Sequence, residues 1–200
     1  MFKKGSMLVA VLVIGLLLGG CGGDASQTSQ AGQQAGQETG QQTGQQAEPK
    51  QARQAMTEWN DQDMDVETNG NLAVALSHLE GLTADDVIAN SGSEQPTLIM
   101  KAPWKYLGKT MAFTGQVGIV QDYPPGSDVG RAFGGDVGEI VMVTGDLTYV
   151  DYMAIGGTGS VGVGDYVTVY GYPIGLVEVD NQIGGKTTQL MVVGKLDLIN

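Results

Sequence analysis

Cys21 is the only cysteine in the sequence, and its thiol is the side chain whose surroundings most clearly indicate a chemical role. It follows a run of aliphatic residues from Met7 to Leu18 and two glycines, and Lys3 and Lys4 lie near the start of the chain. A basic start, an apolar run and small residues before a cleavage site are the three parts of a secretory signal peptide. We therefore expect cleavage before Cys21 and attachment of lipid to its thiol.

The tetrapeptide Leu18-Gly19-Gly20-Cys21 resembles the lipobox of bacterial lipoproteins. Residues 1–20 are then a signal peptide, and acyl chains such as palmitate on Cys21 hold the protein in the cell membrane, on its extracytoplasmic side. The alternative is that the segment stays uncleaved as a membrane anchor and that the Cys21 thiol has no role. The apolar run, however, is about a dozen residues long, short of the roughly 20 that cross a bilayer as a helix.

Oxygen ligands recur at alternate positions after the linker, as in a calcium-binding loop. They are Asp61, Asp63, Asp65, Glu67 and Asn69. An EF-hand needs glycine at its sixth position and a bidentate glutamate at its twelfth, where this sequence has Val66 and Leu72. We therefore interpret the segment as a solvated acidic linker. With a single histidine and no free cysteine besides the lipid-bearing Cys21, the usual zinc ligands are also missing, so no metal site is expected.

Catalytic groups are few. His78 is the only histidine, and its place on an expected helix beside Leu76 and Leu79 favours a surface or half-buried residue over a member of a catalytic triad. The glycine-rich segment at residues 156–159 lacks the Lys-Ser/Thr of a phosphate-binding loop. We expect a protein that is not an enzyme and that uses no cofactor; an envelope hydrolase built on carboxylates is the more distant alternative.

The chain changes composition twice after Cys21. Residues 21–50 combine that cysteine with a linker rich in Gly and Gln, which lacks the apolar side chains needed for a folded core. Residues 51–95 are acidic and partly helical, because Leu72, Leu76 and Leu79 recur at helical spacing and Thr83 to Asp86 resembles a capping box. Residues 96–200 change to β-branched and aromatic residues divided by turn residues.

This last region is expected to contain five strands. They are residues 111–120, 138–144, 147–155, 166–172 and 187–199. Gly115 and Gly118 within the first strand suit a bulge or a sharp coil. The fold class is therefore mainly β, a five-stranded Greek-key barrel like the OB-fold, with a small sandwich as the structural alternative.

A family resemblance supports that expectation. Ala102 to Lys109, followed by Phe113 to Val117, resembles the "Pro-x-x-Tyr-x-Gly-Lys … Phe-Thr-Gly-x-Val" opening of OB-fold domains in bacterial lipoproteins that are similar to the tRNA-anti-like family. Gly164 to Gly171 resembles the "Gly-Asp-x-Val-x-Val-x-Gly" fourth strand of that family. The resemblance covers roughly residues 97–200 and implies a fold and a cell-envelope setting, without a ligand.

An OB-fold binds through its second and third strands and two loops. The expected first loop, residues 121–137, contains Tyr123, Arg131 and Phe133, and the expected third strand contains Tyr149 and Tyr152. With a second loop at residues 173–186, these five residues are the candidate ligand-binding set. The formal net charge of −12 makes nucleic acid an unlikely partner. We expect a protein or glycan of the envelope, with an oligonucleotide as the alternative.

Overall fold

The structure is a computed structural model that describes residues 58–181 and 184–196. Within these ranges no helix is long and apolar enough to cross a membrane. The expected signal peptide, Cys21 and the linker to residue 50 lie outside the described residues, as do residues 51–57 of the acidic segment.

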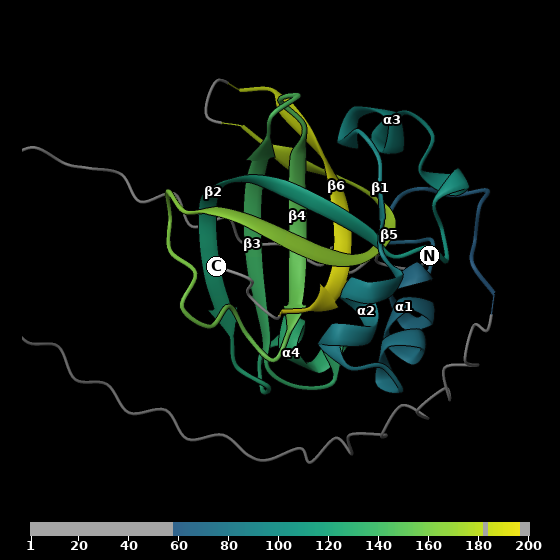
Figure 1. Ribbon diagram of the computed structural model, residues 1–200, viewed down its shortest axis with the longest axis vertical. Helices are drawn as coiled ribbons and strands as arrows, with labels where there is room; N and C mark the ends of the chain where they lie inside the picture. The colour runs from purple at the N-terminus through teal and green to yellow at the C-terminus, as the bar shows by residue number, and fades with distance from the viewer. Residues whose placement is uncertain (1–57, 182–183, 197–200) are drawn as a thin grey trace, which may run out of the picture. The chain divides into compact units, whose positions relative to one another are not determined.

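The architecture is mainly β, a six-stranded mixed sheet accompanied by short helices (Figure 1). The strands are β1 (Gly92–Ser93), β2 (Met111–Tyr123), β3 (Val137–Thr144), β4 (Tyr149–Ile155), β5 (Tyr166–Asp180) and β6 (Lys186–Lys195). Their order is β1-β2-β3-β4-β6-β5, and β2 also pairs with β5. The five long strands therefore form a closed ring of hydrogen bonds. The β4–β6 and β1–β2 pairs are parallel, and the others are antiparallel.

The ring closes through two glycines of β2. Gly115 pairs with Thr144 of β3 and with Val167 of β5, and a Cβ at this position would lie only 2.6 Å from the carbonyl oxygen of Val143. The register then shifts between Val117 and Ile119, which places a bulge at Gly118. The expectation that glycines bend this strand is confirmed. The first part of β2 pairs with β5 and the later part pairs with β3.

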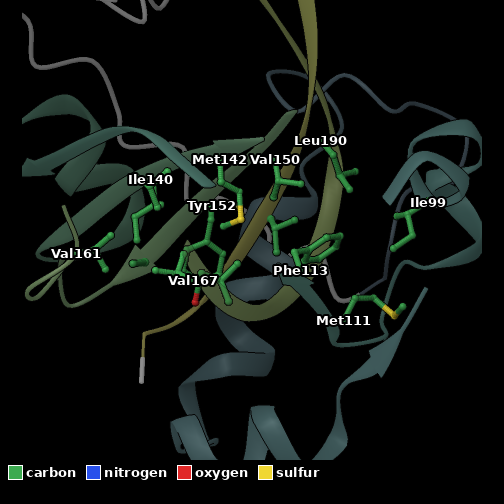
Figure 2. Close-up of a cluster of buried hydrophobic side chains, with 14 residues drawn as sticks. Ile99, Met111, Phe113, Ile140, Met142, Val150, Tyr152, Val161, Val167 and Leu190 are labelled. Atoms are coloured by element: carbon green, nitrogen blue, oxygen red, sulfur yellow. The ribbon is translucent and has the colours of Figure 1, made fainter. Parts of the chain in front are cut away.

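The main core fills the inside of the ring. Figure 2 shows the side chains that meet there, which come from all five long strands, from one helix and, in the case of Val161, from the loop between β4 and β5. Phe113, Ile140, Met142, Val150, Tyr152 and Leu190 are fully buried. Alternate residues of each strand point inward, as the two-residue period of a strand requires. Ile99, from a short helix, also belongs to this cluster.

Two helices cover part of the outside of the sheet. They are α1 (Asn71–Glu80) and α2 (Ala84–Asn90). Leu79 and Val87 form a second buried cluster with Tyr172 and Val193 of the sheet. The expected capping box of α2 is confirmed, because the Thr83 amide donates to an Asp86 carboxylate oxygen at 2.8 Å, and the Asp86 amide donates to the Thr83 hydroxyl at 3.2 Å. The helical segment therefore packs on the sheet.

Three further helical turns were not expected from the sequence. They are α3 (Pro96–Lys101), the 3₁₀ turn η1 (Pro103–Lys105) and α4 (Asp128–Phe133). The helix α4 lies inside the expected loop at residues 121–137, whose first three residues belong to β2. Ser127 caps α4, because its hydroxyl accepts from the Gly130 amide at 2.9 Å, and Gly134 ends it with a φ of 79°.

The expected second loop at residues 173–186 is wrong for most of its length, because β5 continues to Asp180. Pro173 and Gly175 indicated a break. In the structure the register shift between them forms a bulge that accommodates the proline. Gly175 has a φ of 145°, and a Cβ there would lie 2.4 Å from the carbonyl oxygen of Met64. The missing side chain lets Asp65 form a bridge with Leu176.

Candidate binding surface

Tyr123 ends β2 and is half-buried. Its hydroxyl donates a hydrogen bond to a carboxylate oxygen of Glu139 on β3. Burial and the neighbouring Glu139 carboxylate raise the pKa of Tyr123 above its ordinary value, because both disfavour the phenolate. The ring packs against the second core cluster. Tyr123 therefore connects β2 to β3 and offers little surface to a ligand.

Arg131 and Phe133 lie on α4 and point in different directions. Arg131 is exposed, and its guanidinium forms an ion pair with Asp128 and donates to the carbonyl oxygen of Gly126. Phe133 is partly buried and packs against the second core cluster. Arg131 is thus held within its own loop, and Phe133 attaches α4 to the sheet.

Tyr152 is fully buried in the main core, so the expectation that places it on a binding surface is wrong. Its hydroxyl donates to the carbonyl oxygen of Tyr170 at 3.2 Å. Tyr149, by contrast, is 42% exposed. Residues an odd number of positions apart face opposite sides of a strand, so Tyr149 and Tyr152 cannot share a surface. The odd spacing of these two tyrosines in the sequence already indicates that they face opposite sides.

The predicted set is also divided between two ends of the sheet. Tyr123 pairs with Val137, which pairs with Ile155 at the end of β4. Tyr149 pairs with Val143 at the other end of the same two strands. Six residues along the strands, about 20 Å, separate these two ends. The structure therefore does not bring the five predicted residues together.

A different set of residues, three of them exposed, lies in one line across the outer side of the sheet. Tyr166 of β5 pairs with Gln116 of β2, Gln116 pairs with Val143 of β3, and Val143 pairs with Tyr149 of β4. Directly paired residues face the same side of a sheet. These four residues, which we name the tyrosine row, form a line across four strands. Tyr149 lies at one end of the row, and Tyr166, which is 71% exposed, lies at the other end.

Three more exposed apolar residues border the tyrosine row. Ile119 lies on β2 after the bulge, Leu147 lies in the turn before Tyr149, and Val163 precedes Tyr166. Their exposed fractions are 45%, 78% and 69%. Large exposed apolar residues outside this area, among those the structure describes, are Leu98 and Trp104 alone. Exposed apolar groups gathered in one area are typical of interaction sites.

The turn that presents Leu147 is held by a polar network. Asp146 accepts hydrogen bonds from the hydroxyl groups of Thr97 and Thr144, and from the Thr97 amide at 2.9 Å. Burial opposes ionisation of Asp146, but these hydrogen bonds outweigh it and hold its pKa well below the ordinary value. Leu147 itself has a φ of 63°, the only positive φ of a non-glycine residue in the described ranges.

A buried carboxyl group lies on the same outer side of the sheet as Tyr149, two residues further along β4. Asp151 is 4% exposed, and its Oδ1 has no hydrogen-bond partner. Burial, together with the nearby Glu139 carboxylate, raises its pKa to about 8. Both effects favour the protonated form of Asp151.

The acidic segment of the sequence does not gather its oxygen atoms around a common point. Asn69 is fully buried, and its Nδ2 donates to the carbonyl oxygen of Ile174 at 2.8 Å. Asp63 and Asp65 each accept a backbone amide two residues ahead, at 3.0 Å. In residues 58–181 and 184–196 no group of three or more His, Cys, Asp or Glu side chains is arranged to hold a metal ion.

Comparison with known proteins gives one structural similarity. No protein-family model matches the chain, and no curated protein matches it. A crystal structure from Klebsiella pneumoniae, described as a "putative nucleic acid-binding lipoprotein", aligns over 60% of this chain and 100% of its own, at 14% identity and a TM-score of 0.38. A TM-score of this size does not establish a common fold.

Proposed function

We propose that the protein is a membrane-anchored extracytoplasmic lipoprotein whose folded domain is a non-enzymatic OB-fold module that binds another protein through the tyrosine row. A glycan partner, which the sequence allowed equally, is less well supported, because the exposed groups that border the row are aliphatic rather than hydrogen-bonding. The anchor is Cys21, as the motif at residues 18–21 predicts.

The strand order supports an OB-fold. A Greek key has three consecutive hairpin-connected strands and a fourth that returns beside the first. Here β2, β3 and β4 are consecutive, and β5 returns to pair with β2. The strand β6 then lies between β4 and β5 and completes the ring. A five-stranded Greek-key barrel is the definition of the OB-fold, whose second and third strands carry the binding face. In this chain those strands are β3 and β4.

The observation that carries the proposed function is the conformation of Leu147. A positive φ costs an L-residue roughly 1 kcal/mol, which glycine avoids. The turn nevertheless holds a leucine whose side chain is 78% exposed. That side chain belongs to neither of the two buried core clusters. Backbone strain retained at an exposed apolar residue points to a functional role, and contact with a partner surface provides one.

The residues of the tyrosine row favour a protein over a nucleic acid. None of Tyr149, Val143, Gln116 and Tyr166 is basic, and neither are Ile119, Leu147 and Val163 around them. Phosphate groups require lysine or arginine for affinity. Tyrosine and aliphatic side chains are instead typical of the centre of a protein interface.

Site-specific photo-crosslinking tests this proposal. A photoreactive phenylalanine derivative replaces Tyr149 or Tyr166 in the full-length protein in its native cells, and a matched derivative replaces the exposed Glu80 of α1. The proposal expects the same protein adduct from both tyrosine positions and none from position 80. Adducts at position 80 alone, or at none of the three, would contradict binding through the tyrosine row.

A double substitution gives the second readout. Tyr149→Ala with Tyr166→Ala should abolish the adduct formed from a third photoreactive position at Ile119, while the melting temperature changes little, because both tyrosines are exposed. An unchanged adduct in a folded double variant would show that the tyrosines do not contribute to the interface.

A further inference from the structure

The turn formed by α3 and η1 gathers aromatic, aliphatic and basic side chains in one place. An open hollow there is lined by Leu98, Lys101, Ala102, Trp104, Lys105 and Tyr106. Leu98 is 44% exposed and Trp104 is 48% exposed. Lys109 adds a third lysine, with its Nζ 5.7 Å from the centre of the Tyr106 ring. We name Leu98, Lys101, Trp104, Lys105 and Lys109 the basic patch.

The basic patch is held rigidly from beneath. Ile99 of α3 is fully buried in the main core, and Pro103 of η1 is buried as well. Tyr106 packs against the same core. Figure 2 shows Ile99 and Met111 at one side of this cluster, and Figure 1 shows α3 near β1 at the edge of the ring. The patch therefore presents its lysines and Trp104 from a fixed support.

The charge of the basic patch is opposite in sign to the net charge of the whole chain. The sequence from Gln95 to Gln121 contains three lysines and no Asp or Glu, whereas the whole chain has 22 acidic and 10 basic residues. A positive area within an acidic protein attracts negatively charged surfaces and orients the molecule toward them. The exposed Trp104 suits the interface between membrane and water, where tryptophan is enriched.

The path of the chain brings the same area toward the anchor. Trp59 is the second described residue, and the sequence before it leads back to Cys21. A Cβ at Gly108 would lie 3.0 Å from the indole Nε1 of Trp59, so the two residues touch. Gly108 directly precedes Lys109. The chain thus reaches the folded domain beside the basic patch.

From these observations we infer that the basic patch binds the surface of an anionic lipid bilayer, with Trp104 and Leu98 inserted at headgroup level and the three lysines over lipid phosphates. The inference rests on the proposed lipid anchor only because the anchor places the domain beside a membrane. Contact between the basic patch and the bilayer fixes the orientation of the domain on the membrane. The tyrosine row is formed by β2, β3, β4 and β5, which contribute no residue to the basic patch.

Vesicle binding by the unacylated chain tests the inference separately from the anchor. The chain from Gly22 to Asn200 carries no cysteine, so no lipid contributes. It is mixed with vesicles of equal parts phosphatidylglycerol and phosphatidylcholine, or of phosphatidylcholine alone, and sedimented at low and physiological salt. We expect binding to the anionic vesicles that weakens with salt. Each lysine near such a surface contributes a factor of about five, so Lys105→Glu should weaken binding at least that much.

The matched control is Lys186→Glu, which makes the same charge change at an exposed lysine of β6. It should bind nearly as well as the wild-type chain, and Trp104→Ala should bind weakly while keeping its melting temperature. In the Trp59→Phe variant, where Trp104 is the only tryptophan, the emission should shift to shorter wavelength on anionic vesicles.

Three results would overturn the inference. The first is the absence of binding to anionic vesicles. The second is an equal loss of vesicle binding in Lys105→Glu and Lys186→Glu. The third is that the chain binds a labelled oligothymidine through Lys105 and does not bind vesicles. Failure here would leave the acylation of Cys21 and the crosslinks at the tyrosine row unaffected, because neither measurement uses the basic patch.

Discussion

The indole of Trp59 lies directly on Gly108, in the space that a side chain at residue 108 would occupy. Gly108 has a φ of 75°, a conformation that L-residues rarely adopt. The indole also stacks on His78 of α1, with 5.7 Å between ring centres. One residue at the start of the described chain thus connects the loop before β2 with α1.

Gly108→Ala should therefore destabilise the domain. The positive φ contributes roughly 1 kcal/mol, and displacement of Trp59 adds to it. Gly81→Ala is the matched control, because Gly81 has a φ of −89° and a Cβ there would meet no atom within 4 Å. Urea unfolding checks both variants. Equal stability of the two would show that the contact with Trp59 does not matter.

Tyr149 and Tyr152 should respond very differently to truncation, although only two residues separate them. Tyr152→Ala removes a fully buried ring from the main core, which should cost about 3 to 5 kcal/mol. Tyr149→Ala removes a ring that is 42% exposed, and its free energy of unfolding should change by less than about 1 kcal/mol. Denaturant titration measures both. A large loss from Tyr149→Ala would place Tyr149 in the core.

Stability should fall as the pH rises above about 4, because of Asp151. The folded domain holds the proton of Asp151 up to a pKa of about 8, whereas the ordinary value is 3.8. Between these values the folded state binds a proton that the unfolded state has lost, so each pH unit lowers the free energy of unfolding, by up to roughly 1.4 kcal/mol. Asp151→Asn should flatten this dependence in urea titrations from pH 5 to 8. Identical slopes in both proteins would contradict the assignment.

Leu147→Gly should stabilise the domain and weaken its interaction. Glycine relieves the positive φ of the turn, a gain of about 1 kcal/mol that the greater freedom of glycine in the unfolded chain partly offsets. The same change removes an exposed apolar side chain beside the tyrosine row. The measurements are the melting temperature and the yield of the crosslink from position 166. A variant that is no more stable than the wild type, or that crosslinks equally well, would contradict the role given to Leu147.

The sequence predicts the strands of this domain better than its surfaces. The five long strands lie close to the expected ranges, because alternation and turn residues are local signals. The end of β5 was missed because Pro173 and Gly175 normally break a strand, and only the bulge and the contact of Gly175 with Met64 explain its continuation. The short helices α3 and α4 have too few residues to show a helical period.

The candidate site could not be predicted because it depends on register. Tyr166 and Tyr149 are 17 residues apart in the sequence and come together in one row only through Gln116 and Val143. No local pattern contains that alignment. The basic patch is different, since three lysines within nine residues around Trp104 are visible in the sequence. Their common exposure on a buried support is what the structure adds.

The proposed function requires Cys21 to be the lipid-bearing residue of an extracytoplasmic protein. The direct measurement is metabolic labelling of native cells with radioactive palmitate, comparing the full-length protein with its Cys21→Ser variant. The account predicts label in the wild-type protein, a shift to the mass of a chain that begins at Cys21, and no label in the variant. An unlabelled wild-type protein, or equal labelling of the variant, would contradict it.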